Sequence, residues 1–148
     1  MGQIEYSPST DRLGKVVVKY FRDEIYQNFI DEKERIINTG VDEFINQINS
    51  TTMGDDIKNP MIERAKLFCE LTQEQNEVLN RLVLNLLDSV VFNVMRALDE
   101  NVERKKTGIE LKIDGIDVRF LHLIGNGMLS GEIFDWYPRF SKFGQYQF

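Results

Sequence analysis

The sequence predicts an α+β protein, mostly α, in which helices pack around a long central helix over about 73–104. A C-terminal β-hairpin over about 109–120 and an aromatic-rich tail complete the prediction. Three observations support it: apolar residues recur at helical spacing up to about residue 104, they alternate with polar residues over 109–120, and aromatic residues gather after that. The 148 residues can bury a core. We therefore expect a single domain, 1–148, with a helical body over 1–106 and a hairpin and aromatic cap over 107–148.

Spacing and helix-ending residues predict the first helices. Residues 9–38 follow a helical period, and Gly40 suits the left-handed position that often follows a helix. A short second helix is expected over 41–48. Asn59 followed by Pro60 is typical of a further helix start, because Pro is favoured at the first helical position.

The long helix opens at residues 72–75, Thr-Gln-Glu-Gln, which have the form of a capping box. Between 78 and 98 most side chains are apolar, and the polar ones lie mainly on one stripe: Arg81, Asn85, Asp88, Ser89, Asn93 and Arg96. A helix that is apolar around most of its circumference is enclosed by its neighbours, which places this one at the centre. The apolar stretch over 82–95 is too short and too often interrupted to span a bilayer.

The hairpin is predicted by a change of period from 3.6 to 2. Asp114-Gly115 lies between two alternating runs, which indicates a type I′ turn. A two-residue loop pairs 113 with 116 and 112 with 117. In this register the apolar residues share one face, which must pack on the helices.

The tail is predicted to be irregular and packed. Residues 120–148 hold eight of the sixteen aromatic residues, a density that disordered segments lack. Phe92 lies within the polar stripe, and we expect the tail to cover it. Trp136 and Tyr137 have two interpretations: they fill the core of their own domain, or they anchor a protein partner with Glu132 and Asp135 beside them.

Composition excludes several functions. A net charge of −6 argues against nucleic-acid binding, because phosphates attract clustered Lys and Arg. The single cysteine, Cys69, excludes an intramolecular disulfide and a Cys-rich zinc site. The glycines over 125–131 are spaced GxGxxxG, which departs from the dinucleotide-binding pattern. We expect no cofactor, no metal, no catalytic residue and no membrane contact. The polar N-terminus shows no secretory signal, which favours a cytoplasmic protein.

Three function classes stay open at this stage. The acidic helical segments, over 31–64 and 70–104, favour a non-catalytic protein that binds a cationic partner. A small enzyme would need Cys69 and His122 to meet, or the carboxylate doublets to gather around a metal. A structural subunit would form a homodimer through an exposed face, so we expect a monomer or a weak homodimer.

The layout resembles small bacterial immunity proteins, the antidotes encoded with polymorphic or contact-dependent inhibition toxins. The resemblance covers mainly residues 72–143: a long helix, a late hairpin, and the segment Glu-Ile-Phe-Asp-Trp-Tyr-Pro-Arg-Phe-Ser-Lys-Phe over 132–143. It implies a cytosolic, non-catalytic protein that binds and neutralises a cationic toxin domain, such as a nuclease. It fixes no binding residues, because it rests on the pattern of elements and no diagnostic motif.

Overall fold

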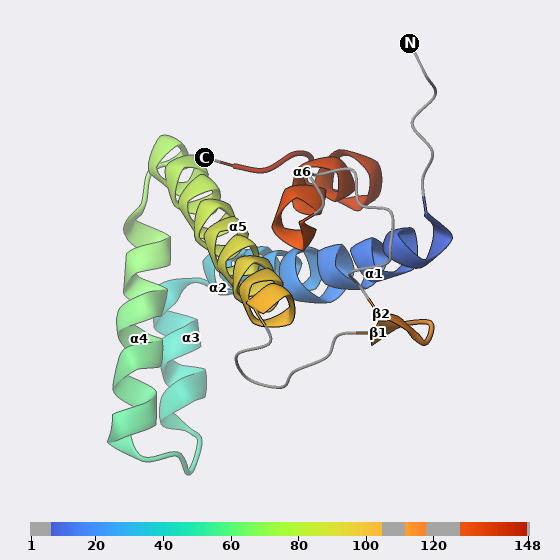
Figure 1. Ribbon diagram of the computed structural model, residues 1–148. Coiled ribbons are helices and arrows are strands. Elements are labelled where there is room, and N and C mark those ends of the chain that lie inside the picture. The colour runs from blue at the N-terminus through green and yellow to red at the C-terminus, as the bar shows by residue number, and fades with distance from the viewer. Residues whose placement is uncertain (1–6, 105–111, 118–127, 148) are drawn as a thin grey trace. The chain divides into compact units, whose positions relative to one another are not determined.

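Most of the described chain is helical, as predicted. The computed structural model describes residues 7–104, 112–117 and 128–147. Figure 1 labels its helices and strands, except the π-helical turn η1. The elements are in chain order α1 (Pro8–Val18), η1 (Lys19–Asp23), α2 (Glu24–Thr39), α3 (Val41–Asn49), α4 (Asp55–Glu70), α5 (Gln73–Arg104), β1 (Lys112–Ile113), β2 (Ile116–Asp117) and α6 (Leu129–Phe140).

The chain forms two compact units. The first unit combines the residues up to Ile25 with those from Leu84 onwards, and the second unit is the continuous segment Tyr26–Val83. The sequence instead predicts a single domain whose two parts meet between residues 106 and 107. The two divisions differ because α1 and η1, which begin the chain, pack with elements that come late in it.

Helix ends follow the local chemistry of the sequence. The Ser7 side chain accepts a hydrogen bond from the Thr10 amide at 3.4 Å, which caps α1. Gly40 has a φ of 86°, the left-handed value expected of it between α2 and α3. The predicted capping box opens α5, where the amide of Thr72 bonds to the side chain of Gln75 and the amide of Gln75 bonds to the side chain of Thr72.

Two local predictions need correction. α4 begins at Asp55, five residues before Pro60, so Pro60 lies inside the helix and does not start it. The charges of Asp55 and Asp56 favour the earlier start, because carboxylates stabilise the first turn of a helix. The tail is also more regular than predicted, since residues 129–140 form α6.

The helix α5 has the predicted bounds but two unlike faces. Its inner face is buried and consists of Leu84, Asp88, Val91 and Met95. A second set of apolar residues, at every fourth position, is between 44% and 59% exposed: Val78, Leu82, Leu86, Val90 and Val94. We call these five residues the outer row. The expectation that α5 is enclosed around most of its circumference is therefore wrong along this row.

The core of the first unit lies where α6 meets α1 and α5. It contains the buried residues Val17, Val18, Val91, Met95, Leu129, Ile133, Trp136 and Tyr137. A Cβ atom added to Gly14 would lie 2.6 Å from two ring atoms of Trp136, so only glycine admits the indole this close to α1. The α6 N-terminus is closed by Asp99 of α5, whose carboxylate accepts the amides of Leu129 and Ser130 at 2.7 and 2.9 Å.

The described strands agree with the predicted register. Lys112 pairs with Asp117 and Ile113 with Ile116, in antiparallel orientation. Asp114 and Gly115 both have positive φ, 53° and 78°, as a type I′ turn requires. The remainder of the hairpin predicted over 109–120 lies outside the described residues.

The second unit has its own core between α2, α3, α4 and the start of α5. The buried residues are Ile36, Phe44, Ile48, Ala65 and Phe68. Phe29 packs edge-on against Phe68, with ring centroids 6.0 Å apart. These contacts join helices that are consecutive in sequence, so the unit is held together by one continuous stretch of chain.

Candidate functional site

Negative charge is concentrated on the second unit. Residues 26–83 hold eleven Asp and Glu against six Lys and Arg, which accounts for −5 of the chain's −6. Ten of these eleven acidic residues are exposed, and the remaining one, Glu32, is half-buried. They are Asp31, Glu32, Glu34, Asp42, Glu43, Asp55, Asp56, Glu63, Glu70, Glu74 and Glu77. We call this set the acidic surface.

One of the six cations is buried, and a second is paired with a member of the acidic surface. The Lys33 side chain is buried, and its ammonium group donates hydrogen bonds to the amide oxygens of Asn76 and Asn80. Burial lowers the pKa of Lys33, because desolvation disfavours the charged form. Arg64 is paired with Glu32 at 2.7 Å. The exposed charge of the second unit is therefore mainly negative.

Local structure holds several of the acidic residues in place. Asp42 and Glu43 lie in the first turn of α3, and Asp55 and Asp56 lie in the first turn of α4. The partial positive charge at a helix N-terminus favours carboxylates there. The acidic doublets thus have a structural reason for their position, and they remain exposed to a partner.

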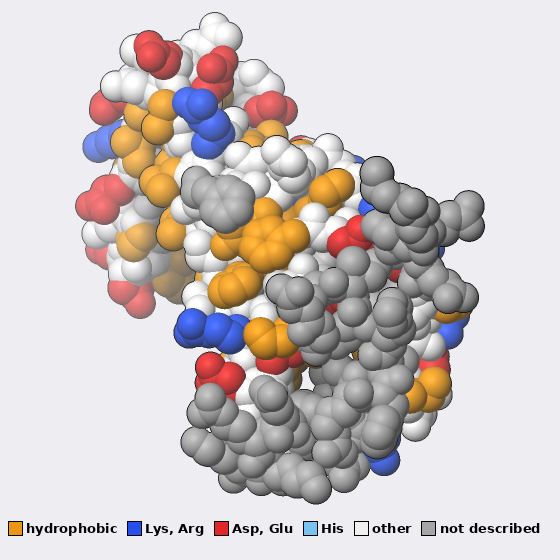
Figure 2. All heavy atoms as spheres, turned by 45° about the horizontal axis from the view of Figure 1, so that its top comes forward, with side chains coloured by type: hydrophobic (Ala, Val, Ile, Leu, Met, Phe, Trp, Pro, Cys, Tyr) orange, Lys and Arg blue, Asp and Glu red, His pale blue; other side chains and the backbone are white. Residues whose placement is uncertain are grey.

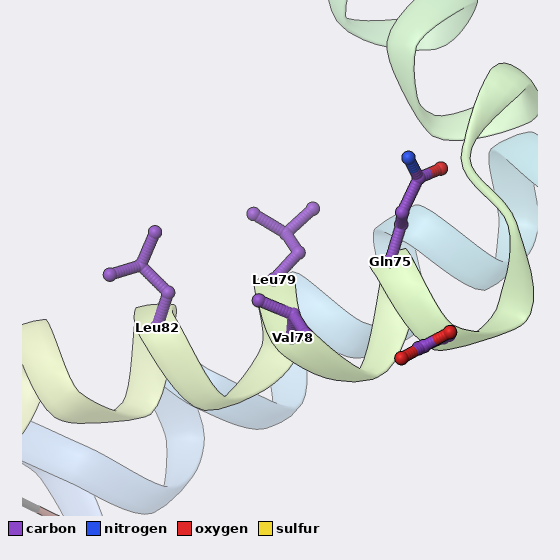
Figure 3. Close-up of a pocket in the computed structure, with 5 residues that line it drawn as sticks. Gln75, Val78, Leu79 and Leu82 are labelled. Carbon is purple, nitrogen blue, oxygen red and sulfur yellow. The ribbon is translucent and has the colours of Figure 1, made fainter.

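A shallow hollow lies at the start of α5, in the second unit. It has a volume of about 380 Å³ and is lined by Glu74, Gln75, Val78, Leu79 and Leu82. Figure 3 shows the side chains of Gln75, Leu79 and Leu82 directed to the same side of the helix. The lining of the hollow is mainly apolar, and the hollow offers no pair of groups suited to acid–base chemistry.

The sequence-predicted anchors are placed in the core of the first unit. Trp136 and Tyr137 are both 0% exposed, and Glu132 is 1% exposed. Asp135 is half-buried and pairs with Arg139 at 2.8 Å. These four residues offer little exposed surface to a partner in this structure, because α6 turns its aromatic face onto α1 and α5.

The interpretation that the tail covers Phe92 is confirmed. Phe92 is half-buried and packs against Phe134 and Tyr146, with ring centroids 6.1 and 6.4 Å away. Tyr146 also stacks on Tyr137 at 6.1 Å. Part of the tail is thus bound to α5 by aromatic contacts.

The structure describes only part of the residues proposed for an enzyme. Cys69 is half-buried, and its sulfur lies 4.0 Å from the backbone oxygen of Ile36. His122 lies outside the described residues, so its distance from Cys69 is undefined. Among the residues that the structure describes, no three His, Cys, Asp or Glu side chains gather as metal ligands would.

A buried ion pair that sequence reasoning missed lies in the first unit. Arg22 and Asp88 are both 0% exposed and are joined by two hydrogen bonds, of 2.6 and 3.0 Å. The Arg22 guanidinium also donates to the side chain of Ser141 and to the backbone oxygens of Gly144 and Gln145, at 2.6–2.9 Å. All five of its donors are used, so burial leaves none unsatisfied.

The same network fixes the backbone of residues 141–147. Asp23 accepts the amide of Lys142 at 2.9 Å, and Asp88 accepts the amide of Gln147 at 2.7 Å. Asn85 donates to the backbone oxygen of Gln147 at 2.9 Å. We call this set of contacts the tail clamp. Arg22 and Asp23 both lie in η1, and π-helical turns are frequent where side chains have specific roles.

One signal in the sequence points to the tail clamp. Asp88 shares its helical stripe with Leu84, Val91 and Met95, at spacings of three and four residues. A carboxylate on a buried apolar stripe needs a cationic partner. Asp88 also belongs to the polar stripe of α5, and nothing close to it in the sequence identifies Arg22 as its partner.

Comparison with known proteins gives no family. No protein-family model matches the chain, and no curated protein or solved structure is similar enough to match it. Fold and chemistry therefore define only a class, a mostly helical protein with two compact units. One unit is acidic, and the other consists of two chain segments joined by the buried Arg22–Asp88 ion pair.

Among the described helices, α5 is long and apolar enough over Gln73–Glu100 to cross a membrane, by length and composition alone. The core helix of a soluble protein passes the same test. This finding by itself does not assign α5 to a membrane.

Proposed function

We propose that the chain is a non-catalytic binding protein of the cytoplasm that uses the acidic surface to bind a cationic protein. Its resemblance to immunity proteins indicates the kind of partner, a toxin domain that the chain neutralises. The observation that carries the proposal is the concentration of −5 of the net charge on residues 26–83, in exposed side chains.

Charge of this kind acts mainly on the rate of association. A surface of one sign steers an oppositely charged partner and raises the association rate, and added salt screens the effect. Strong binding also needs apolar contacts that exclude water. Exposed apolar residues of α4, Ile57 and Leu67, lie in the same unit as the acidic surface and provide such contacts.

The first experiment uses the protein encoded beside this chain's gene, because immunity proteins are encoded with their toxins. The neighbour is expressed alone and together with the chain, and growth is measured. Toxicity that the chain relieves, together with a complex that survives gel filtration, supports the proposal. A harmless neighbour, or a toxic one that the chain neither binds nor inhibits, contradicts it.

The second experiment tests the acidic surface with two variants that add the same charge. Asp55→Asn with Asp56→Asn removes two negative charges from the second unit. Glu24→Lys changes the net charge by the same amount at an exposed residue outside that unit. We expect the double variant to associate with the toxic neighbour about threefold to tenfold more slowly at low salt, and Glu24→Lys to change little. Equal effects from both variants, or a rate that salt does not change, would refute the role of this surface.

A further inference from the structure

Residues 141–147, which follow α6, are held in the first unit as a receptor holds a peptide. We call them the tail segment; they form no helix or strand, and Figure 1 shows them in red beyond α6. Side chains of η1 and α5 are the hydrogen-bond partners of five of their backbone groups: the amides of Lys142 and Gln147, and the carbonyl oxygens of Gly144, Gln145 and Gln147. In peptide recognition, main-chain hydrogen bonds of this kind give affinity, and pockets for side chains give specificity.

One aromatic side chain anchors the tail segment. The Tyr146 ring lies 5.1 Å from the ring of Phe134 and 6.4 Å from that of Phe92. It also stacks on Tyr137. We call these three rings the aromatic pocket. Phe134 is 44% exposed, so the aromatic pocket opens at the surface of the unit. Figure 2, in which the upper part of Figure 1 comes forward, shows hydrophobic side chains gathered in the middle of that face, with few charged ones among them.

Two further residues of the tail segment have a defined role. Gly144 has a φ of 78°, a left-handed value that residues with a side chain rarely adopt. With this turn, the backbone oxygens of Gly144 and Gln145 both accept hydrogen bonds from Arg22, at 2.6 and 2.9 Å. The hydroxyl of Ser141 accepts a hydrogen bond from Arg22 and donates one to Asp23, at 2.8 and 2.7 Å. The segment is therefore recognised by a small number of its own features.

The centre of the tail clamp does not depend on the tail segment for its position. Two hydrogen bonds to Asp88 hold the Arg22 guanidinium, and its central carbon lies 4.0 Å from the centre of the Tyr137 ring. The remaining three donors of Arg22 bind the tail segment, and water can replace the segment at each of them. The guanidinium is thus oriented for a peptide before the peptide binds, which lowers the cost of binding.

We propose that the tail clamp and the aromatic pocket form a peptide-binding site, and that the tail segment is its exchangeable ligand. The ligand class is a short segment with the pattern Ser-x-Phe-Gly-x-Tyr. The two x positions are those of Lys142 and Gln145, whose side chains are exposed, whereas Phe143 is half-buried. A segment of another protein with this pattern would compete for the site. This inference goes beyond the proposed function and does not rest on it.

Covalent attachment favours the chain's own segment. Ser141 follows α6 directly, so the connection is short, and attachment of this kind gives an effective concentration of about 1 mM or more. An added peptide therefore binds the wild-type chain weakly, because it must displace the attached segment. A change that weakens the attached segment without altering the site should make the added peptide bind more strongly.

The first test measures hydrogen exchange by NMR on the full wild-type chain. The amides of Lys142 and Gln147 should exchange at least about 100-fold faster than those of Val91 and Ile133 in the core, because the segment leaves without global unfolding. They should also exchange about tenfold or more slowly than in an isolated peptide of residues 141–147, because the site protects them. Exchange as slow as that of the core amides, or as fast as that of the isolated peptide, would overturn the proposal.

The second test measures the binding of an added peptide to the full chain by fluorescence polarisation. The peptide has the sequence of residues 141–147 and carries fluorescein on the Lys142 side chain. Tyr146→Ala in the chain should raise the apparent affinity about tenfold or more, because the site is then more often empty. Gln145→Ala is the matched control, and it should bind the peptide as the wild type does. Equal binding by the two variants, or no binding to either at about 1 mM peptide, would overturn the proposal.

Gly144→Ala weakens the attached segment without removing an aromatic contact, so it keeps the proposal testable if Tyr146→Ala fails to fold. A Cβ atom added to Gly144 meets no atom within 4 Å, and the change therefore acts on the left-handed backbone alone. We expect the added peptide to bind this variant about threefold to tenfold more strongly than the wild type. Circular dichroism of the same samples verifies that they are folded. A folded Gly144→Ala chain that binds no more peptide than the wild type would contradict the proposal.

The third test locates the bound peptide, with the Tyr146→Ala chain as the receptor. Peptides with Gly144→Ala or Tyr146→Ala should bind about tenfold or more weakly, and a peptide with Gln145→Ala should bind equally well. Asn85→Ala in the receptor removes the donor to the Gln147 oxygen and should weaken binding about threefold to tenfold. Binding that none of these changes affects would place the peptide elsewhere on the chain and overturn the proposal.

Discussion

The tail clamp makes a strong prediction about stability. Arg22→Met leaves the Asp88 carboxylate buried without its cation, and Asp88→Leu leaves the Arg22 guanidinium buried without its anion. Breaking one side of a fully buried ion pair costs about 3–5 kcal/mol, against a total stability of about 5–15 kcal/mol for an ordinary domain. We therefore expect either single variant to lose a large part of its free energy of unfolding.

The double variant separates the ion pair from the other contacts of Arg22. Arg22→Met with Asp88→Leu leaves no isolated charge, so it should cost less than the two single changes added together, by about 2–3 kcal/mol. Some loss should remain, because Gly144 and Gln145 lose the donor that holds their backbone oxygens. Urea unfolding followed by circular dichroism measures all three variants.

An exposed ion pair serves as the control. Arg64 and Glu32 lie 2.7 Å apart, and each side chain is 43% exposed. The same cycle with Arg64→Met and Glu32→Leu should give a coupling below about 1 kcal/mol. If the Arg22 and Asp88 changes were additive, or if each cost no more than the control variants, the reasoning about the buried pair would be refuted.

Three other changes test single features of the first unit. Gly14→Ala should destabilise the protein by about 1–3 kcal/mol in urea unfolding, because the added Cβ meets the indole of Trp136, although Ala favours helices. Trp136→Phe combined with Gly14→Ala should recover part of this loss. Asp99→Ala should cost about 1 kcal/mol in thermal unfolding by removing the cap of α6, and an equally stable variant would contradict that role. Burial, reinforced by the Asp88 carboxylate, raises the pKa of Tyr137 above its ordinary value of 10.0, so the folded protein keeps a proton that the unfolded chain releases. Stability should therefore fall as pH rises above about 10, by up to about 1.4 kcal/mol per pH unit, and Tyr137→Phe should flatten that slope in urea titrations at several pH values.

Local signals in the sequence predicted much of the fold. The bounds of α5, the left-handed Gly40 and the pairs Lys112–Asp117 and Ile113–Ile116 all depend on residues close together in the chain. Capping boxes and tight turns depend on a few neighbouring residues, so they can be predicted without knowledge of tertiary contacts.

Features that depend on distant residues were missed. The sequence could not pair Arg22 with Asp88, because the two residues are 66 positions apart. In the sequence alone, Gly14 only lowers the helix propensity of its segment, and its role appears once Trp136 is seen to pack on it. The sequence predicts that the outer row is buried, since exposed and buried leucines give the same helical period.

The candidate site was predicted in part. The acidity of residues 31–64 and 70–104 indicated a negative helical region, and the structure concentrates it on the second unit. Trp136 and Tyr137 were assigned to a partner or to the core on composition alone. An aromatic residue satisfies either role, and only the packing of α6 distinguishes them.

The tail clamp also bears on the order in which the protein folds during synthesis. Residues 26–83 are contiguous, so the second unit has its complete set of contacts once they leave the ribosome. Arg22 emerges early, yet one of its acceptors is 123 residues further along the chain. Until residues 141–147 are synthesised, Arg22 stays solvated and the apolar surface of the first unit stays exposed. Chaperones would bind the nascent chain most readily during this interval.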